Sequence, residues 1–230
     1  MTMVRLARLV AVSMIALLVS ACTYQTVPQA PAAEELQPPT PRRISGRYLL
    51  NVEATGLTRN GAVSGGCGSY SYPVNAGGAF SNAMRTALEG RFERIEVSSA
   101  STVAELRRAR ANGLIMIQPA QFEPRADVDQ RGFRSMVRAA TAMAANVILD
   151  RDDRRAFQGT IEGNGTAEVP TAMIGGCGAV QQAINQATEH AIEQLAERLA
   201  QRLAAVPGLG PVVVRRPVRR APDVAPPATR

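Results

Sequence analysis

The clearest hydrophobic pattern in the chain lies near its C-terminal end, between Ala179 and Leu203. Apolar residues recur there every three or four positions, and glutamine, glutamate and arginine occupy the opposite side, which is typical of an amphipathic helix. Pro207 and Gly208 follow the pattern and predict its end. The apolar stripe consists of Val180, Ala183, Ile184, Ala187, Ala191, Leu195, Leu199 and Leu203. We therefore expect a long C-terminal helix with one buried face.

Two shorter helices are predicted earlier in the chain. One begins after residues 75–78, and a second, shorter one begins where Thr102 and Glu105 form a capping box. Gly113 is expected to stop the second helix. The inward positions of the first helix are Phe80, Ala83, Met84, Ala87, Leu88 and Phe92, and those of the second are Leu106 and Ala109.

Alternating or short apolar runs predict the strands. Residues 47–53 and 94–97 alternate, and the apolar run 114–117 suits a short, buried central strand. Residues 58–68 are rich in glycine, serine and asparagine, so we expect a loop there.

A long β-hairpin is predicted between Phe133 and Val169. Residues 136–149 and 157–169 form its arms, and the polar segment 150–154 is its turn. Alanines fill much of the first arm, and such a stretch also suits a helix. The order of elements predicts an α+β domain, in which two main helices, including the long C-terminal one, pack on one face of a mostly antiparallel sheet.

The N-terminal segment has the form of a bacterial export signal. Arg5 and Arg8 precede the apolar run Leu9–Val19, which is too short to span a membrane. The run ends in Val19-Ser20-Ala21-Cys22, which resembles the lipobox of bacterial lipoproteins. The resemblance implies removal of residues 1–21 and fatty acylation of Cys22, with palmitate among the acyl chains. The alternative is an ordinary secretory signal followed by a chance cysteine.

The residue after the cysteine bears on localisation. Thr23 stands where an aspartate would retain many such proteins in the inner membrane, so the resemblance favours the outer membrane. Several acyl chains, at ~0.8 kcal/mol per buried CH2, hold a protein on a bilayer without a spanning segment. We expect a lipid-anchored outer-membrane protein whose domain faces the periplasm.

Composition divides the rest of the chain into three parts. Residues 22–44 carry five prolines and no hydrophobic periodicity, which predicts an extended tether reaching roughly 60 Å at ~3.1 Å per residue. Residues 45–205 form the globular domain. Residues 206–230 are rich in proline and arginine and are expected to be disordered.

The net charge of +7 is concentrated at the ends of the chain. Residues 45–214 carry 17 arginines against 16 acidic residues, so composition predicts no nucleic-acid-binding face. The tail carries the paired arginines Arg215, Arg216, Arg219 and Arg220. They form either a solvated tail or a site for anionic partners such as lipopolysaccharide phosphate or the cell wall.

The order of elements over residues 45–205 also resembles small envelope lipoproteins of the YajG and LptE-like kind. The resemblance is one of pattern, with a Tyr-Pro-Val entry to the first helix at residues 72–74 and a hairpin that leads into a C-terminal helix. The LptE-like members assist an outer-membrane barrel that exports lipopolysaccharide. No residue of this chain is matched to that role.

Two cysteines remain for a disulfide in an oxidising compartment. The sequence Gly-Gly-Cys-Gly occurs at residues 65–68 and 175–178, around Cys67 and Cys177. Because Cys22 is assigned to the lipid, these two are expected to pair. The flanking glycines let the two backbones approach closely.

Several patterns of catalytic or cofactor sites are incomplete. A cysteine nucleophile would need His190, the only histidine, which lies at the flank of the C-terminal helix. The glycines around Cys177 lack the third glycine of a dinucleotide fingerprint, because Gln181 stands there. The acidic turn that begins at Asp150 lacks the glycine and glutamate of a calcium loop, since Arg155 and Ile161 occupy those positions. We expect no cofactor and no metal.

These observations favour a non-enzymatic outer-membrane lipoprotein that acts as an envelope assembly or accessory binding factor. Its expected partners are the bilayer, through acylated Cys22, and another envelope protein. Lipopolysaccharide or cell wall is a further candidate through the tail. The alternative is an envelope ligand carrier or hydrolase with a site near the Cys67 and Cys177 loops. A rigid, polar-lined pocket at residues 58–68 would favour the alternative.

Overall fold

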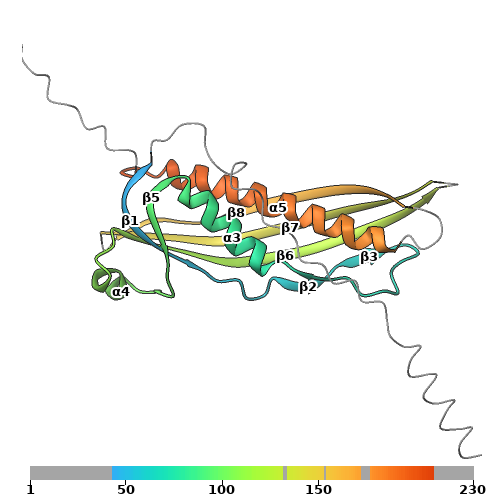
Figure 1. Cartoon of the computed structure of the whole chain (residues 1–230), viewed down its shortest axis with the longest axis horizontal. Coiled ribbons are helices and arrows are strands. Elements are labelled where there is room, and N and C mark those ends of the chain that lie inside the picture. Colours follow the sequence, from blue (N-terminus) through green and yellow to red (C-terminus); the bar gives the residue numbers. More distant parts are fainter. Residues whose placement is uncertain (1–42, 132–133, 153, 172–176, 210–230) are drawn as a thin grey trace, which may run out of the picture.

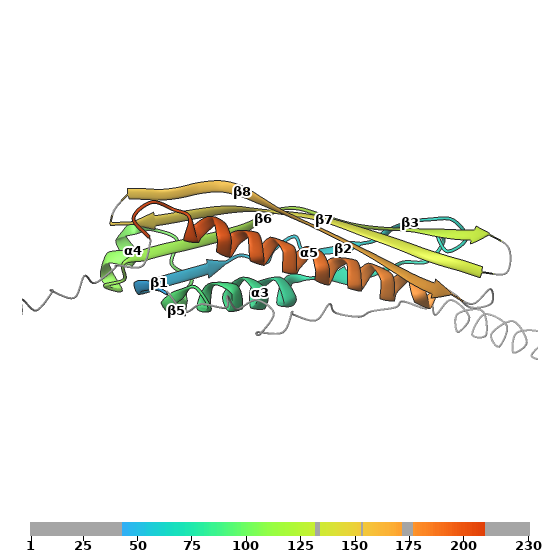
Figure 2. The same cartoon turned by 90° about the horizontal axis from the view of Figure 1, so that it is seen from above.

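The computed structural model describes residues 43–131, 134–152, 154–171 and 177–209. These residues form an elongated molecule in which helices lie along a layer of strands (Figure 1, Figure 2). In chain order the elements are β1 (Ile44–Val52), β2 (Thr58–Asn60), β3 (Ala62–Ser64), β4 (Pro73–Asn75), α3 (Gly77–Glu89), β5 (Phe92–Val97), α4 (Val103–Arg108), β6 (Gly113–Arg131), β7 (Arg134–Arg151), β8 (Arg154–Thr171) and α5 (Gly178–Ala204).

The main sheet has the strand order β5-β1-β6-β7-β8, and β3 also pairs with β6. β5, β1 and β6 are parallel, whereas β6, β7 and β8 form a long antiparallel ladder. β2 and β4 form a separate antiparallel pair. This confirms the predicted α+β class, with a mostly antiparallel sheet and a long C-terminal helix.

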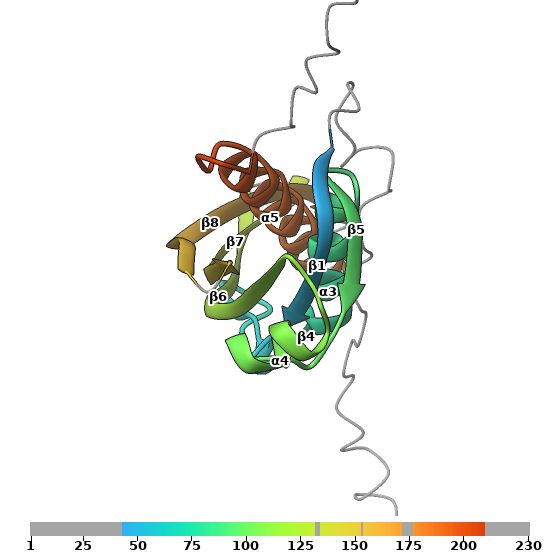
Figure 3. The ribbon, with the colours of Figure 1, turned by 90° about the vertical axis from the view of Figure 1, so that its left-hand side faces the viewer.

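The two main helices, α3 and α5, lie on one face of the sheet, here called the inner face (Figure 3). Their buried residues share one core with inward-pointing strand residues such as Leu50 and Ile115. Successive strand residues point to opposite faces, so Leu49 and Leu114 point to the outer face. Leu106 of α4 packs there, in a separate small cluster. Among the described residues, α4 is the helix that covers the outer face, and it covers only one end.

The predicted hairpin is confirmed as β7 and β8, but the prediction for β6 was wrong in length. β6 extends well beyond residue 117, with exposed polar residues alternating with buried ones. Pro119 and Pro124 obscure this pattern, because proline removes a donor from a ladder. Both lie between the parts of β6 that pair with β1 and with β3, where the described chain places no strand on that edge. The buried residues of this extension are Phe122, Pro124, Ala126 and Val128.

The expected loop at residues 58–68 is also corrected, since it contains the short strands β2 and β3. Its glycines serve packing as well as turning. A Cβ at Gly61 would lie 2.7 Å from Cδ1 of Ile184, so a larger residue there would require the Ile184 side chain of α5 to move. Gly65 has a positive φ of 85°, which glycine adopts without strain.

Smaller boundaries differ around α3 and α4. Phe92 is buried but opens β5 and does not belong to the face of α3. The capping box of Thr102 and Glu105 is present, as predicted. α4 ends at Arg108, and Gly113 begins β6 instead of stopping the helix.

The closest approach between helix and sheet lies between α5 and two glycines of β8. A Cβ at Gly165 would lie 1.9 Å from the carbonyl oxygen of Ala187, and one at Gly163 would lie 2.2 Å from that of Ala191. No side chain fits at these distances, so the helix backbone rests directly on the strand backbone.

Side chains of α5 also cover the edge of β8 that pairs with no strand in the described sheet. Four helix residues rise about 6 Å and two strand residues about 6.8 Å, so every fourth helix residue meets every second strand residue. Covering an edge in this way prevents further strand addition. Three hydrogen bonds join side chains of α5 to the backbone at this edge. They join Nδ1 of His190 to the Thr166 carbonyl oxygen (2.9 Å), Oε1 of Gln194 to the Asn164 amide (2.8 Å) and Nη1 of Arg198 to the Glu162 carbonyl oxygen (2.8 Å).

The predicted disulfide between Cys67 and Cys177 is present and joins the turn after β3 to the start of α5. The buried hydroxyl of Tyr72 donates a hydrogen bond to the Cys67 carbonyl oxygen, 3.3 Å away. The bridge therefore ties the first turn of the long helix to the segment that follows the edge strand β3.

We predict that Gly165→Ala lowers the free energy of unfolding by about 1–3 kcal/mol or more, because the methyl group forces α5 away from β8. Gly78→Ala is the matched control, since no atom lies within 4 Å of a Cβ there. That variant should leave stability unchanged or slightly higher. Urea unfolding followed by circular dichroism measures both. Equal stability of the two variants would show that α5 does not rest on β8 as described.

We also predict that reduction of the Cys67–Cys177 bridge lowers stability by up to about 4–5 kcal/mol, because the bridge closes a loop of 110 residues. Urea unfolding with and without reductant measures the loss. A Cys67→Ala/Cys177→Ala double variant is the control and should not respond to reductant. Quantitative thiol labelling of both cysteines before reduction would contradict the bridge itself.

Candidate functional site

An open groove of about 800 Å³ crosses the outer face of the sheet, at the end away from α4. Four strands, β3, β6, β7 and β8, contribute to it. We call it the outer-face groove. It is lined by Ala62, Val63, Ser64, Arg125, Ala126, Asp127, Arg138, Ala139, Ala140, Thr166, Ala167 and Glu168.

The register of the ladder explains how these residues meet. Residues paired across neighbouring strands point to the same face, so two complete rows of side chains lie on the outer face. The intervening row of Ala126, Ala139 and Ala167 points into the inner core and offers only its backbone to the groove. The two outer rows are Arg125–Ala140–Thr166 and Asp127–Arg138–Glu168.

Small residues on the middle strand make the floor of this face. Outward positions of β7 are the alanines Ala140, Ala142 and Ala144, here called the alanine row, while β6 and β8 carry longer polar side chains beside them. β6 and β8 are two strand spacings apart, about 10 Å, which is close to the diameter of a helix. Ala140 and Ala142 are partly exposed, so a shallow trough extends from the groove as far as Ala142, whereas Ala144 is buried.

Carboxylates predominate on the walls of the groove and trough. Ser64 Oγ donates to Oδ1 of Asp127 at 2.5 Å, and Nε of Arg138 lies 3.1 Å from Oε1 of Glu168. Both contacts lie on the Asp127–Arg138–Glu168 row and fix its charged side chains. Among the described outward side chains at positions 121–129, 136–146 and 160–170, acids outnumber arginines, which favours basic partners. These charged residues are Glu123, Asp127, Asp129, Glu162 and Glu168 against Arg125 and Arg138.

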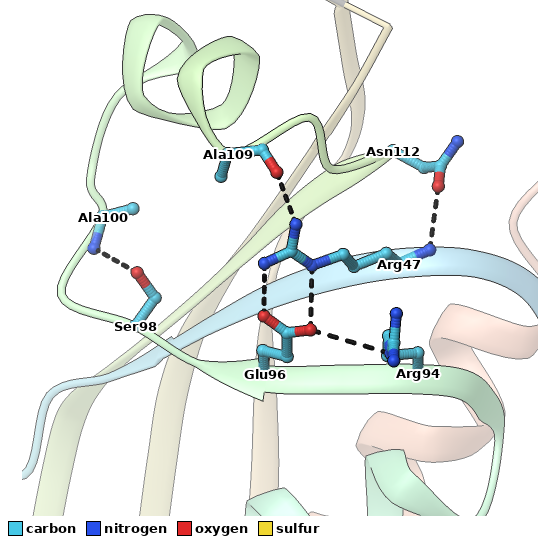
Figure 4. A network of polar contacts seen from close by, with 7 residues as sticks. All are labelled: Arg47, Arg94, Glu96, Ser98, Ala100, Ala109 and Asn112. Atoms are coloured by element: carbon cyan, nitrogen blue, oxygen red, sulfur yellow. Dashed lines mark hydrogen bonds and ion pairs between the residues drawn. The ribbon is translucent and has the colours of Figure 1, made fainter.

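A second polar cluster fixes α4 on the outer face (Figure 4). The Arg47 guanidinium donates to both carboxylate oxygens of Glu96, at 2.8 and 2.5 Å, and to the carbonyl oxygen of Ala109 at 2.5 Å. The side chain of Asn112 accepts from the Arg47 amide at 2.8 Å. The cluster thus joins β1, β5 and the segment after α4. Because the charged groups of Arg47 and Glu96 bond to each other, the cluster has a structural role.

Hydrogen bonds lower the pKa values of two carboxyl groups, those of Glu96 and Glu105. The hydrogen bonds from Arg47 hold the pKa of Glu96 below its ordinary value, and the same contact raises the pKa of Arg47. The backbone amide of Ser101, with the hydroxyl and amide of Thr102, lowers the pKa of Glu105 in the capping box. Both carboxylates therefore stabilise the folded state in their charged form.

The other predicted site residues do not assemble into a catalytic centre in the described chain. His190 lies on the edge of β8, and Cys67 and Cys177 are joined to each other. Asp150 is buried and accepts from Nε of Arg155 at 3.0 Å. Within the described ranges, no three acidic, histidine or cysteine side chains are placed to hold a metal ion.

Some predictions concern residues that the structure does not describe. The signal peptide, acylated Cys22, the tether and the tail arginines Arg215, Arg216, Arg219 and Arg220 all lie outside the described residues. Within the described part, no helix has the length and apolar character needed to cross a membrane.

Sequence reasoning missed the outer-face groove. The available signal was an alanine at every second position of residues 140–144, which marks a strand face without bulk. The groove can be predicted from this signal only when the neighbours of β7 and their register are known.

No protein-family model matches the chain, and no curated protein matches it. Several solved structures are similar in part. One is a Xanthomonas campestris protein with the family description DUF330, at 15% identity and a TM-score of 0.45, covering 77% of this chain and 93% of that one. Another is a minor lipoprotein from Acinetobacter baumannii, at 12% identity and a TM-score of 0.34, covering 69% and 90%. A hypothetical protein from Chlamydia trachomatis has 7% identity and a TM-score of 0.34, covering 70% and 95%. At such TM-scores, no inference about function follows from these likenesses.

We predict that acid destabilises the protein partly through Glu96. Its lowered pKa means that its stabilising effect is present above pH 4.5, the ordinary value, and is lost as the pH falls through the lowered pKa. Glu96→Gln should be less stable than wild type at neutral pH and should lose less stability on acidification. Urea unfolding at pH 7 and pH values below 4.5 measures the difference.

The control is Glu162→Gln, which removes an exposed carboxyl group of β8. It should keep the full acid sensitivity of the wild type. An identical acid response of Glu96→Gln and wild type would argue against a stabilising bond between Arg47 and Glu96.

Proposed function

We propose that this protein is a non-enzymatic, lipid-anchored outer-membrane factor that binds a basic segment of another envelope protein on the outer face of its sheet. The lipobox around Cys22 supports the anchor. The carrying observation is the outer-face groove with the alanine row, a sheet face that the described chain leaves open beyond α4.

The shape of this face suits a protein segment. A floor of alanine methyl groups between longer side chains accepts a helix or an extended segment, with its apolar residues against the floor. The flanking carboxylates of Glu123 and Glu162 would then meet basic side chains at the margins of that segment. Charge complementarity of this kind sets partner choice and orientation more than affinity.

Three observations support binding without catalysis. Cys67 and Cys177 are bonded to each other, and a cysteine nucleophile requires a thiolate beside a base. Nδ1 of His190 lies 2.9 Å from the Thr166 carbonyl oxygen at the strand edge. The side chains of the outer-face groove are carboxylates, arginines, hydroxyls and alanines, several of them already bonded to one another.

A ligand carrier with a site near the Cys67 loop is the second candidate. The observation in its favour is that Ala62, Val63 and Ser64, which belong to residues 58–68 and precede that loop, line the outer-face groove. A small, largely apolar ligand would occupy the groove alone and would not extend to Ala142. Competition by such a ligand would favour this candidate.

The test is photo-crosslinking in intact cells with a photoreactive residue at Ala140, in the groove, in the lipidated full-length protein. The matched control carries the same residue at Asn82, which is exposed on α3. We expect capture of one envelope protein from Ala140 and not from Asn82, with a basic crosslinked peptide. Charge reversal by Asp127→Lys/Glu162→Lys should reduce capture several-fold.

The reversal has its own control in Glu197→Lys, an exposed change on α5 that should leave capture unchanged. Equal capture from Ala140 and Asn82, or capture that ignores the charge reversal, would count against the proposal. A crosslink from Ala140 to residues 210–230 of the same chain would show that the tail, and not another protein, occupies the groove.

A further inference from the structure

Charge is distributed unevenly along the molecule. The start of β1, the start of β5, the β7–β8 turn and the C-terminal end of α5 lie together, since Ile44 pairs with Phe92, Gly113 pairs with Arg151, and Nη1 of Arg151 donates to the Gly208 carbonyl oxygen. α4 lies at the same end (Figure 1). We call this region the basic end.

The basic end carries most of the arginines in the described chain. Its charged segments are residues 43–47, 89–96, 105–110, 150–155 without residue 153, and Arg202. Together these segments contain eleven arginines and six acidic residues, whereas the rest of the described chain contains seven arginines and nine acidic residues. The molecule therefore has a basic end and an acidic remainder.

Many of these arginines face solvent. Arg94, Arg107, Arg108, Arg110, Arg154 and Arg202 are all exposed. Some of the acids at this end are neutralised by contacts, because Glu96 pairs with Arg47 and Asp150 with Arg155. The excess positive charge is thus available to a surface outside the protein.

Both ends of the described chain also leave from here. Arg43 is the first described residue and precedes β1, so the segment that bears Cys22 joins the domain at this end. Leu209 is the last described residue and follows the end of α5, so the tail with its four paired arginines joins here as well.

We propose that the basic end docks on the anionic headgroups of the bilayer that holds the acylated Cys22. This inference rests on the lipid anchor of the proposed function. The acyl chains hold the protein on the bilayer, and a basic patch adds electrostatic attraction to its anionic lipids. The attraction acts over roughly 8–10 Å at physiological ionic strength. The tether, by contrast, would let an undocked domain move as far as roughly 60 Å away.

Docking at this end gives the molecule a fixed orientation. The outer-face groove lies toward the opposite end of β7, and its charged lining is balanced, with Arg125 and Arg138 against Asp127 and Glu168. The groove therefore points away from the bilayer, toward the compartment where a partner would be met.

The experiment uses the lipidated full-length protein reconstituted in vesicles of phosphatidylcholine with or without phosphatidylglycerol. A fluorophore is attached at Ala104→Cys on α4 or at Asn164→Cys on β8, both exposed positions, and is quenched by headgroup-labelled lipid. With phosphatidylglycerol, we expect several-fold stronger quenching at Ala104 than at Asn164. The difference should disappear without phosphatidylglycerol and at about 1 M salt, where screening is complete within ~3 Å.

Variants separate the domain from the tail. Arg108→Glu/Arg154→Glu should abolish the selective quenching, whereas Arg59→Glu/Arg125→Glu makes the same change in net charge at exposed positions outside the basic end and should preserve it. Replacing the four tail arginines by glutamine should also preserve it. Loss in the tail variant alone, or equal quenching at both labels, would overturn the docking proposal. Release of the protein from vesicles at high salt would instead contradict the lipid anchor at Cys22, on which the proposed function depends.

Discussion

The direct contact between the backbone of α5 and the two glycines of β8 is the constraint on which the rest of the structure depends. Gly163 and Gly165 remove the side chains that would normally separate a helix from a sheet, so α5 lies closer to β8 than side-chain packing allows. At that distance Gln194 and Arg198 can reach the strand edge with hydrogen bonds. The same contact that packs the core therefore also closes the exposed edge of the sheet.

The lengths of the elements then decide which face stays open. β6, β7 and β8 have 18 or 19 residues each, which corresponds to about 60 Å of strand. α5 has 27 residues and covers about 40 Å of the inner face, with α3 beside it. α4 has six residues and covers about 9 Å of the outer face. Within the described residues, most of the outer face therefore carries no helix, and the alanine row places only small side chains there.

Local patterns made most of the fold predictable, and pairing between distant strands limited the rest. The stripe of α5 and the capping box of Thr102 depend on neighbours within a few residues, so the sequence displays them directly. The extent of β6 was hidden because Pro119 and Pro124 break the local signal, although the partner strand β7 tolerates them. The outer-face groove depends on Arg125, Ala140 and Thr166 standing side by side, which no local pattern encodes. The disulfide was predictable because, with Cys22 assigned to the lipid, only Cys67 and Cys177 were left to pair.

The separation between the basic end and the outer-face groove allows two opposite charge preferences in one small domain. Twelve or so residues of β7 lie between Asp150 and Arg138, which corresponds to about 40 Å. That distance is several times the 8–10 Å over which charges interact at physiological ionic strength. Anionic lipid at one end therefore neither attracts nor repels a basic segment at the other. A shorter ladder would bring the acidic walls within reach of the headgroups, and the repulsion would oppose docking. The length of the β6–β8 ladder, fixed by backbone pairing, would thus let the proposed attachment and the proposed recognition be set independently.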